Sequence, residues 1–220
     1  MRPIPQRIID PKPEPICANQ SPTLTIALAG NPNAGKTSLF NSLTGLRQKV
    51  ANYPGVTVES KSGLWSLSAE LSPARLIDLP GLYSLEATSV DEEIARDILL
   101  GRATNITKPD AVVVVVDATN LVRNLYLATQ LIETQQPIVI ALTMFDRAER
   151  DSLKIDTQKL STALGVPVVP VVAKRRRGLK QLANAVRGVL GRSLPGFDGS
   201  GEKPRSGQTE AAEVSGNNQR

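Results

Sequence analysis

A chain of 220 residues with a net charge of +5, 40% hydrophobic residues and 3% aromatic residues suits one globular domain with tails. It has no histidine and a single cysteine, Cys17, which excludes a Ser-His-Asp triad, an intramolecular disulfide and a zinc site with the usual nitrogen and sulfur ligands. No apolar run reaches the roughly 18 residues that span a bilayer. The sequence therefore predicts a cytoplasmic protein, with attachment to the inner face of the cell membrane left open.

Composition divides the chain into three parts. Residues 1–22 contain six prolines and are predicted to form an extended leader. Residues 193–220 are rich in Gly, Ser, Glu, Lys and Asn, which predicts a disordered tail. The folded domain is therefore predicted to cover residues 23–192.

Strand-like and helix-like patterns alternate through this domain. In chain order, the predicted elements are strand Leu24–Ala29, helix Lys36–Leu46, strands Val56–Leu67 and Arg75–Leu79 as a hairpin, helix Asp91–Leu100, strand Ala111–Asp117, helix Leu121–Glu133, strand Pro137–Thr143, helix Asp156–Leu164, strand Val166–Val172 and helix Gly178–Leu190. This order predicts an α/β fold in which a mostly parallel sheet is covered by helices on both faces. Ligands of such sheets bind at the carboxyl ends of the strands.

A phosphate-binding pattern lies between the first predicted strand and helix. Residues Gly30–Thr37, GNPNAGKT, match G-x-x-x-x-G-K-[ST]. Glycines let the backbone curl around phosphate oxygens, and the helix N-terminus adds partial positive charge. Lys36 is predicted to reach the β- and γ-phosphates as a catalytic residue, and Thr37 to ligate Mg²⁺. The nucleotide-binding residues predicted here are Gly30, Asn31, Pro32, Asn33, Ala34, Gly35, Lys36, Thr37 and Ser38.

Two further elements fit a nucleotide switch. Thr57, preceded by Gly55 and Val56, is a second candidate ligand of Mg²⁺ that would sense the γ-phosphate. Asp78 ends a predicted strand, where its carboxylate can hold a magnesium-bound water. Gly81 can then present its backbone N–H to the γ-phosphate. We therefore predict catalytic roles for Thr57 and Gly81 and nucleotide contacts for all five residues.

Base recognition is predicted at the ends of two later strands. Thr143 and Asp146 follow one strand, and a carboxylate there can accept the N1–H and N2–H₂ of guanine, which adenine lacks. Val172, Ala173 and Lys174 follow the last strand, where a backbone N–H can contact the guanine O6. These residues predict GTP and GDP as the ligands.

These motifs resemble the N-terminal GTPase domain of FeoB-type ferrous iron transporters. The resemblance covers about residues 24–190 and is carried by residues 31–41 (NPNAGKTSLFN), 52–59 (NYPGVTVE), 78–85 (DLPGLYSL) and 91–97 (DEEIARD). It implies the P-loop NTPase three-layer sandwich of small GTPases and a K⁺ ion bound by Asn33 that stimulates hydrolysis. Leu82 stands where classical small GTPases carry a catalytic glutamine, so the resemblance implies slow intrinsic hydrolysis.

The sequence departs from the family at three points. Thr143 replaces the usual Asn of the base motif and reaches less far, and Val172 replaces the usual Ser, so weaker guanine affinity is expected. The resemblance implies a helical domain near residue 190 and a membrane permease after it, so we expect this chain to be a stand-alone partner of a separate permease, a fragment, or a relative with another regulatory use. We therefore expect a GTP-hydrolysing switch that regulates ferrous iron transport through a separate permease or other membrane protein. The alternative is a stand-alone GTPase associated with RNA or the ribosome, which the basic run Lys174–Arg177 allows and the scarcity of aromatic residues disfavours.

Overall fold

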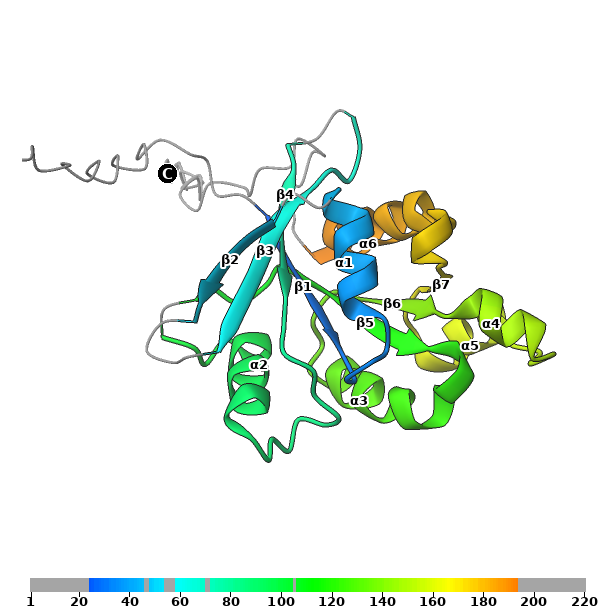
Figure 1. The fold of residues 1–220 in the computed structure, drawn as a ribbon, viewed down its shortest axis with the longest axis horizontal. Coiled ribbons are helices and arrows are strands. Elements are labelled where there is room, and N and C mark those ends of the chain that lie inside the picture. The colour runs from blue at the N-terminus through cyan, green and yellow to red at the C-terminus, as the bar shows by residue number, and fades with distance from the viewer. Residues whose placement is uncertain (1–23, 46–47, 54–57, 70–71, 105, 194–220) are drawn as a thin grey trace, which may run out of the picture.

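A seven-stranded sheet lies between two layers of helices (Figure 1). The computed structural model describes residues 24–45, 48–53, 58–69, 72–104 and 106–193. The strand order is β2-β3-β4-β1-β5-β6-β7, and β3 is the one strand of this sheet that runs opposite to all the others. This arrangement confirms the predicted α/β class and the predicted hairpin, because β3 pairs with β4 in antiparallel register.

The elements follow one another with short connections. The strands are β1 (Thr25–Gly30), β2 (Gln48–Asn52), β3 (Glu59–Trp65), β4 (Ala74–Asp78), β5 (Ala111–Asp117), β6 (Ile138–Thr143) and β7 (Val168–Pro170). The helices are α1 (Lys36–Thr44), α2 (Val90–Leu100), α3 (Leu121–Glu133), α4 (Phe145–Arg150), α5 (Thr157–Leu164) and α6 (Leu179–Ser193), with short 3₁₀ turns η1 (Ala118–Asn120) and η2 (Ala173–Arg175).

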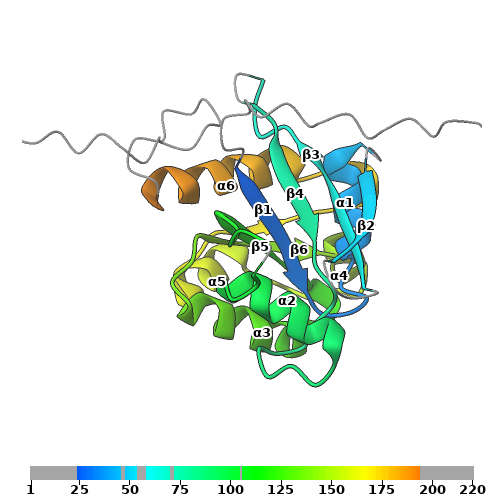
Figure 2. The ribbon, with the colours of Figure 1, turned by 90° about the vertical axis from the view of Figure 1, so that its left-hand side faces the viewer.

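The central strand β5 shows how one apolar run serves two cores. Its consecutive valines point alternately to the two faces of the sheet, because side chains alternate along a strand. Val113 and Val115 pack with α1 and α6, whereas Val112, Val114 and Val116 pack with α2 and α3. Figure 2 shows these two layers of helices on opposite sides of the sheet. A strand buried on both faces therefore needs an unbroken β-branched sequence.

Several predicted boundaries were wrong for local reasons. Helix α1 ends at Thr44 rather than at residue 46, because Gly45 adopts a left-handed conformation with φ 63° and caps it. Strand β2 was not predicted, since its side chains at Lys49, Val50 and Ala51 are exposed and carry no alternating pattern. Ser193, which was predicted to begin the tail, ends α6. The predicted leader and residues 194–220 lie outside the described residues.

Two more differences occur near the site. Helix α4 was not predicted; it is a single short helix that begins where Met144 adopts a left-handed conformation with φ 52°. The last strand is shorter than predicted, because Val172 leaves β7 to form an isolated antiparallel bridge with Arg177. Both features belong to loops at the carboxyl ends of strands, where function is expected to lie.

Candidate nucleotide-binding site

Most of the predicted site residues meet at one edge of the sheet. Gly30, Asp78 and Thr143 end the strands β1, β4 and β6, and these parallel strands place their carboxyl ends side by side. The β1–α1 loop crosses this edge (Figure 1). The predicted site residues therefore lie at the carboxyl ends of the strands, where ligands of such sheets bind.

The β1–α1 loop has the backbone shape that a phosphate cradle requires. Gly30 has φ 153°, and a Cβ there would lie 2.5 Å from the carbonyl oxygen of Val115, so a side chain cannot fit. The Ala34 N–H donates to the Asn31 carbonyl oxygen at 3.3 Å, which closes a tight turn before α1 begins. The first N–H groups of a helix have no intrahelical acceptor. The exposed residues Thr37 and Ser38 lie in this first turn, so the loop and helix together offer donors to an anion.

Lys36 and Asp78 form the charged centre of this region. Burial lowers the pKa of Lys36, although the carboxylate of Asp78 opposes that shift. Burial likewise raises the pKa of Asp78, against the attraction of Lys36 and Lys61. The Asp78 side chain is buried, and its Oδ1 has no hydrogen-bond partner among the described residues. Because both groups are partly removed from water, a bound polyanion would stabilise the charge of Lys36, and a bound cation would stabilise that of Asp78.

Oxygen donors at this centre fit a hard cation. The orphaned Oδ1 of Asp78 and the exposed hydroxyl of Thr37 are of the type that Mg²⁺ prefers. Asn33 is exposed at the tip of the loop with φ 64°, where its side-chain oxygen is accessible to an ion. Among the described residues there is no group of three or more His, Cys, Asp or Glu side chains that could hold a metal ion.

Gly81 lies directly on the phosphate loop. A Cβ at this position would be 2.9 Å from Cγ and 3.0 Å from N of Pro32. The next residue, Leu82, is fully buried, and its N–H donates to the Gly30 carbonyl oxygen at 3.3 Å. The backbone after Asp78 therefore packs against the phosphate loop. The Gly81 N–H would lie close enough to donate a hydrogen bond to a phosphate in that loop.

A hollow opens between the phosphate loop and the start of α2. Its lining residues are Pro32, Asn33, Lys36, Val58, Glu59, Pro80, Gly81, Ser89, Asp91 and Glu92. Glu92 caps α2: its Oε2 accepts from the N–H and the hydroxyl of Thr88, both at 2.9 Å. The Glu92 pKa is lowered by these bonds. The pattern Ser89-x-x-Glu92 is a capping-box signal that could have placed the start of this helix from the sequence.

Two described residues flank the segment that holds the second predicted Mg²⁺ ligand, and they bond to each other. Gly55, Val56 and Thr57 lie outside the described residues. Tyr53 comes before them and is buried; its N–H donates to the Val58 carbonyl oxygen at 2.9 Å, which joins the two ends of the segment. Burial raises the pKa of Tyr53 to about 12, so its hydroxyl stays protonated. No sequence pattern predicted that Tyr53 joins the two ends of this segment.

Helix α3 holds the segment that follows Gly81. The side chain of Gln130 accepts from the Leu85 N–H at 2.8 Å, and the Arg123 guanidinium lies 4.4 Å from the centre of the Tyr83 ring. The amide of Asn31 in the phosphate loop donates to the Arg123 carbonyl oxygen at 3.5 Å. No sequence pattern predicted these contacts, because each joins residues far apart in the chain.

Thr143 connects the base end to the phosphate loop. The sequence suggested that its short side chain would reach less far than asparagine. In the structure the buried Thr143 hydroxyl lies 2.6 Å from the Ala34 carbonyl oxygen and 3.1 Å from that of Val116. Its single proton can bond either acceptor, so the hydroxyl ties the end of β6 to the phosphate loop. The loop-to-loop tether is therefore present with threonine.

The remaining base-end residues come from α4 and η2. Asp146 lies in the first turn of α4, and Ala173 and Lys174 lie in η2. An ion pair at 3.3 Å joins Glu149 of α4 to Arg177, which follows η2. The Ser42 hydroxyl of α1 lies 3.1 Å from the Ala173 carbonyl oxygen and 2.9 Å from that of Ser38, and its single proton can bond either acceptor. Val172 is buried with 6% exposure, which leaves its backbone rather than its side chain for any ligand.

Comparison with known proteins decides the family. The profile of the family FeoB_N, described as ferrous iron transport protein B, matches residues 24–186. The chain belongs to this family. The Fe(2+) transporter FeoB of Salmonella typhimurium is 51% identical over 168 residues, which cover 74% of this chain and 21% of that relative. The chain thus spans about a fifth of the length of this curated FeoB protein.

Solved FeoB domains have the same fold. A mutant of S. thermophilus NFeoB bound to GDP is 49% identical with a TM-score of 0.67, over 74% of this chain and 61% of that chain. The G domain of the T. maritima FeoB iron transporter is 42% identical with a TM-score of 0.67, over 76% of this chain and 98% of that chain. The FeoB-type chain described here therefore has a P-loop GTPase fold. In its described part, no helix is both long and apolar enough to cross a bilayer.

Proposed function

We propose that this FeoB-type domain binds GTP with Mg²⁺, hydrolyses it to GDP and phosphate, and acts as a switch in ferrous iron transport. The observation that carries the proposal is the convergence of Lys36, Asp78 and Gly81 on a glycine-shaped phosphate loop at the carboxyl ends of parallel strands. The FeoB relatives support the guanine nucleotide, since an S. thermophilus NFeoB structure contains GDP.

The phosphates are proposed to bind at the loop and the first turn of α1. Backbone N–H groups of residues 33–38 surround the phosphate oxygens, and Lys36 adds a positive charge that burial has already desolvated. A desolvated lysine gains more from a polyanion than an exposed one, because less water must be removed on binding. A half-buried lysine at this position is therefore well suited to a phosphate ligand.

Magnesium is proposed to be held by Thr37, by Thr57 and, through water, by Asp78. When bound it would neutralise charge on the β- and γ-phosphates. Asn33 is proposed to hold K⁺ beside the phosphates. In this chain Asp78 supplies an ionised oxygen once a cation is present, because a nearby positive charge lowers the pKa of a carboxyl that burial has raised.

Guanine is proposed to bind between α4 and η2. Asp146 would accept two N–H groups of the base, and the backbone at Ala173 and Lys174 would contact O6. Two contacts support this proposal: the Arg177–Glu149 ion pair joins α4 to the segment after η2, and the Thr143 hydroxyl joins the end of β6 to the phosphate loop.

Hydrolysis is proposed to depend on backbone positioning. Leu82 is fully buried and apolar, so it cannot orient a water molecule. The Gly81 N–H, Lys36 and Thr57 are then the groups left to stabilise the transferring phosphoryl, and slow intrinsic turnover is expected. The released state of the loops would signal to a permease or other membrane protein. The relative from Salmonella typhimurium is an Fe(2+) transporter, which supports a role in iron transport.

The test is a titration of the full chain with fluorescent GTP and ATP analogues in Mg²⁺. We expect GTP to bind at least about tenfold more tightly, and the Asp146→Ala variant to lose that preference while still binding nucleotide. Equal affinity for both nucleotides in the unmodified chain would disprove guanine selectivity. Turnover is expected to be faster in KCl than in NaCl, and identical rates would disprove the role of Asn33.

A further inference from the structure

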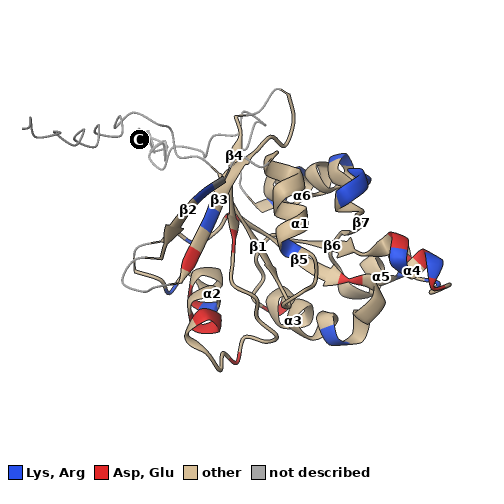
Figure 3. Ribbon diagram, viewed as in Figure 1, with Lys and Arg blue, Asp and Glu red and all other residues tan. Residues whose placement is uncertain are grey.

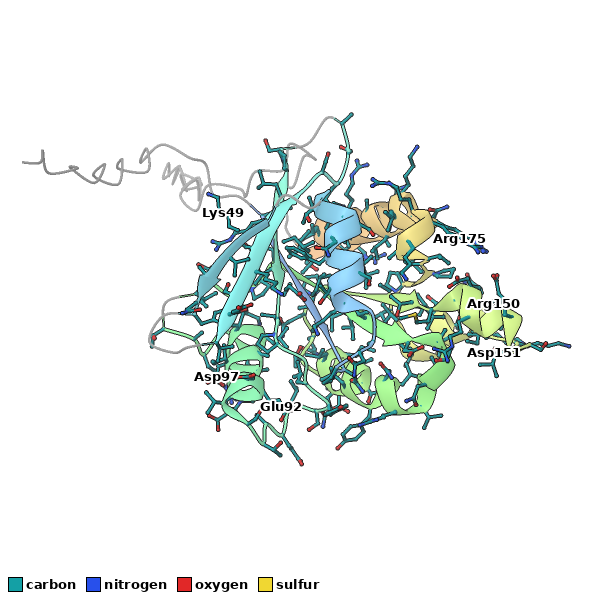
Figure 4. The ribbon with its side chains drawn as sticks, in the orientation of Figure 1. Lys49, Glu92, Asp97, Arg150, Asp151 and Arg175 are labelled. Carbon is teal, nitrogen blue, oxygen red and sulfur yellow. The ribbon has the colours of Figure 1, made fainter. Side chains whose placement is uncertain are left out.

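One end of the molecule carries an excess of positive charge that the proposed function does not use. This basic end consists of the residues around η2, the start of α6 and α4. Its cations are Arg147, Arg150, Lys174, Arg175, Arg176, Arg177 and Lys180, against the carboxylates Asp146, Glu149 and Asp151. Figure 3 shows basic residues gathered at the start of α6 and beside it, and Figure 4 shows Arg150 and Arg175 projecting from this end. Over the rest of the described chain the two signs nearly balance.

The backbone of η2 fixes these cations in an outward turn. The Val172 N–H donates to the Arg177 carbonyl oxygen at 3.0 Å, and the Arg177 N–H donates back to Val172 at 3.2 Å. These two bonds close a loop that presents Lys174, Arg175 and Arg176 to solvent, and all three are exposed. The cations thus sit on a closed turn whose base is fastened to the sheet.

Ion pairing leaves most of this charge uncompensated. Arg177 pairs with Glu149 at 3.3 Å. In the part of the chain that the structure describes, Lys174, Arg175 and Arg176 form no ion pair. Adjacent like charges on a closed turn repel one another, and a partner with several negative charges relieves that repulsion.

We propose that the basic end docks on an anionic lipid surface. Clusters of four to eight Lys and Arg side chains bind the headgroups of such surfaces without a shaped pocket. Nucleic acid fits less well, because single-stranded binders need aromatic platforms for the bases. The exposed aromatic residues Tyr83 and Tyr126 lie on the α3 side, and Phe145 packs against the core beside α4.

Docking in this way would bring the proposed guanine loop close to the membrane. Ala173 and Lys174 are part of the same closed turn as Arg175 and Arg176. The FeoB relatives are named as Fe(2+) transporters, so a lipid surface is near their G domains. The proposal does not rest on guanine binding, because charge attraction to headgroups needs no nucleotide.

The experiment is co-sedimentation of the full chain, without nucleotide, with phosphatidylcholine vesicles that contain or lack roughly 30% phosphatidylglycerol. We expect binding only to the anionic vesicles, and loss of that binding as NaCl rises from about 0.05 to about 0.5 M. The Arg175→Gln/Arg176→Gln variant is expected to bind at least about tenfold more weakly.

The matched control is Lys49→Gln/Arg102→Gln, which removes the same charge from exposed sites away from the basic end. It is expected to bind anionic vesicles within about twofold of the unmodified chain. Equal losses in both variants would overturn the proposal, because only net charge would then matter. Binding of a single-stranded RNA but not of anionic vesicles would overturn it in favour of nucleic acid. Thermal unfolding of both variants checks that each is folded.

Discussion

The two ends of the candidate site are built in different ways. The phosphate end is a single loop of consecutive residues, Gly30–Thr37, closed by backbone bonds and packed on Gly81. The base end is assembled from α4 and η2: an ion pair joins Glu149 of α4 to Arg177, which follows η2, and the buried Thr143 hydroxyl contacts the phosphate loop. A loop made of neighbours in sequence is specified locally, whereas the base end depends on contacts between distant residues.

This difference has an energetic consequence. Lys36 and Asp78 are held with perturbed pKa values because burial removes them from water. Such groups gain much from a bound ligand of opposite charge, so nucleotide binding depends strongly on them. Arg177 and Glu149 are both exposed, and exposed ion pairs contribute little. Substitutions at the phosphate end are therefore expected to reduce nucleotide affinity and turnover more than substitutions at the base end.

Lys36→Ala should have the largest effect. It removes the one cation of the phosphate loop, so affinity for GTP should fall by about 2–4 kcal/mol, roughly 30- to 1000-fold. The measurement is a titration with a fluorescent GTP analogue. Lys49→Ala, an exposed lysine on β2, is the control and should bind normally. Unchanged affinity in Lys36→Ala would show that the loop does not bind phosphate.

Gly81→Ala should affect turnover next most strongly. A Cβ there would lie 2.9 Å from Pro32 Cγ and 3.1 Å from Pro32 Cα, so the backbone must move away from the phosphate loop. GTP hydrolysis should fall by roughly 100-fold, since small misplacements of catalytic groups are costly, while GDP still binds. The measurement is phosphate release in single turnover.

Gly188→Ala is the matched control for that change. A Cβ at Gly188 in α6 meets nothing within 4 Å. Alanine should stabilise the helix by about 0.5–1 kcal/mol and leave hydrolysis unaltered. If Gly81→Ala hydrolyses GTP as fast as this control, the backbone at Gly81 takes no part in the reaction.

Thr143→Val tests the tether between the two ends. The change keeps the shape but leaves the buried Ala34 carbonyl oxygen without its 2.6 Å donor. The free energy of unfolding should fall by about 1–3 kcal/mol, and nucleotide affinity should fall with it. Urea unfolding measures the first. The control is Thr129→Val at an exposed position of α3, which should change the free energy of unfolding very little. An equally small change in Thr143→Val would show that the Thr143 hydroxyl does not stabilise the contact between β6 and the phosphate loop.

Asp78→Asn should trade function for stability. Burial raises the pKa of Asp78, so ionisation at neutral pH costs the nucleotide-free protein stability. The variant should be about 1 kcal/mol more stable than the unmodified chain at pH 7, and Mg²⁺-dependent GTP binding should weaken. As the pH falls through the raised pKa, the unmodified chain becomes protonated and the stability difference should shrink. The measurement is the free energy of unfolding of both proteins at a series of pH values. A difference that stays constant with pH would show that the ionisation of Asp78 is not its cause.

Arg177→Gln should have the smallest effect. It breaks an exposed ion pair with Glu149, which contributes less than about 1 kcal/mol. GTP affinity should change by no more than about fivefold, and a double-mutant cycle with Glu149→Gln should give a similarly small coupling. A loss as large as that of Lys36→Ala would mean that the base end is as tightly constrained as the phosphate end.

The sequence predicted most of the fold because its apolar periods are strong. The unbroken valines of β5 and the amphipathic pattern of α3 required no tertiary information. Strand β2 was missed because its exposed side chains carry no pattern, and it exists through pairing with β3. Helix α4 was missed because it is too short to show a period. Both errors lie where neighbours in space outweigh neighbours in sequence.

For the site, the sequence by itself determined the phosphate loop, because eight consecutive residues specify both its backbone shape and its chemistry. It also placed Asp78 and Asp146 at strand ends. Only the tertiary structure decided that Thr143 can tie the loop to β6, that Gly81 lies against Pro32, and that Gln130 holds the segment beyond it. The reason is physical: these contacts depend on strand order and on the approach of loops separated by tens of residues, which a local pattern does not encode.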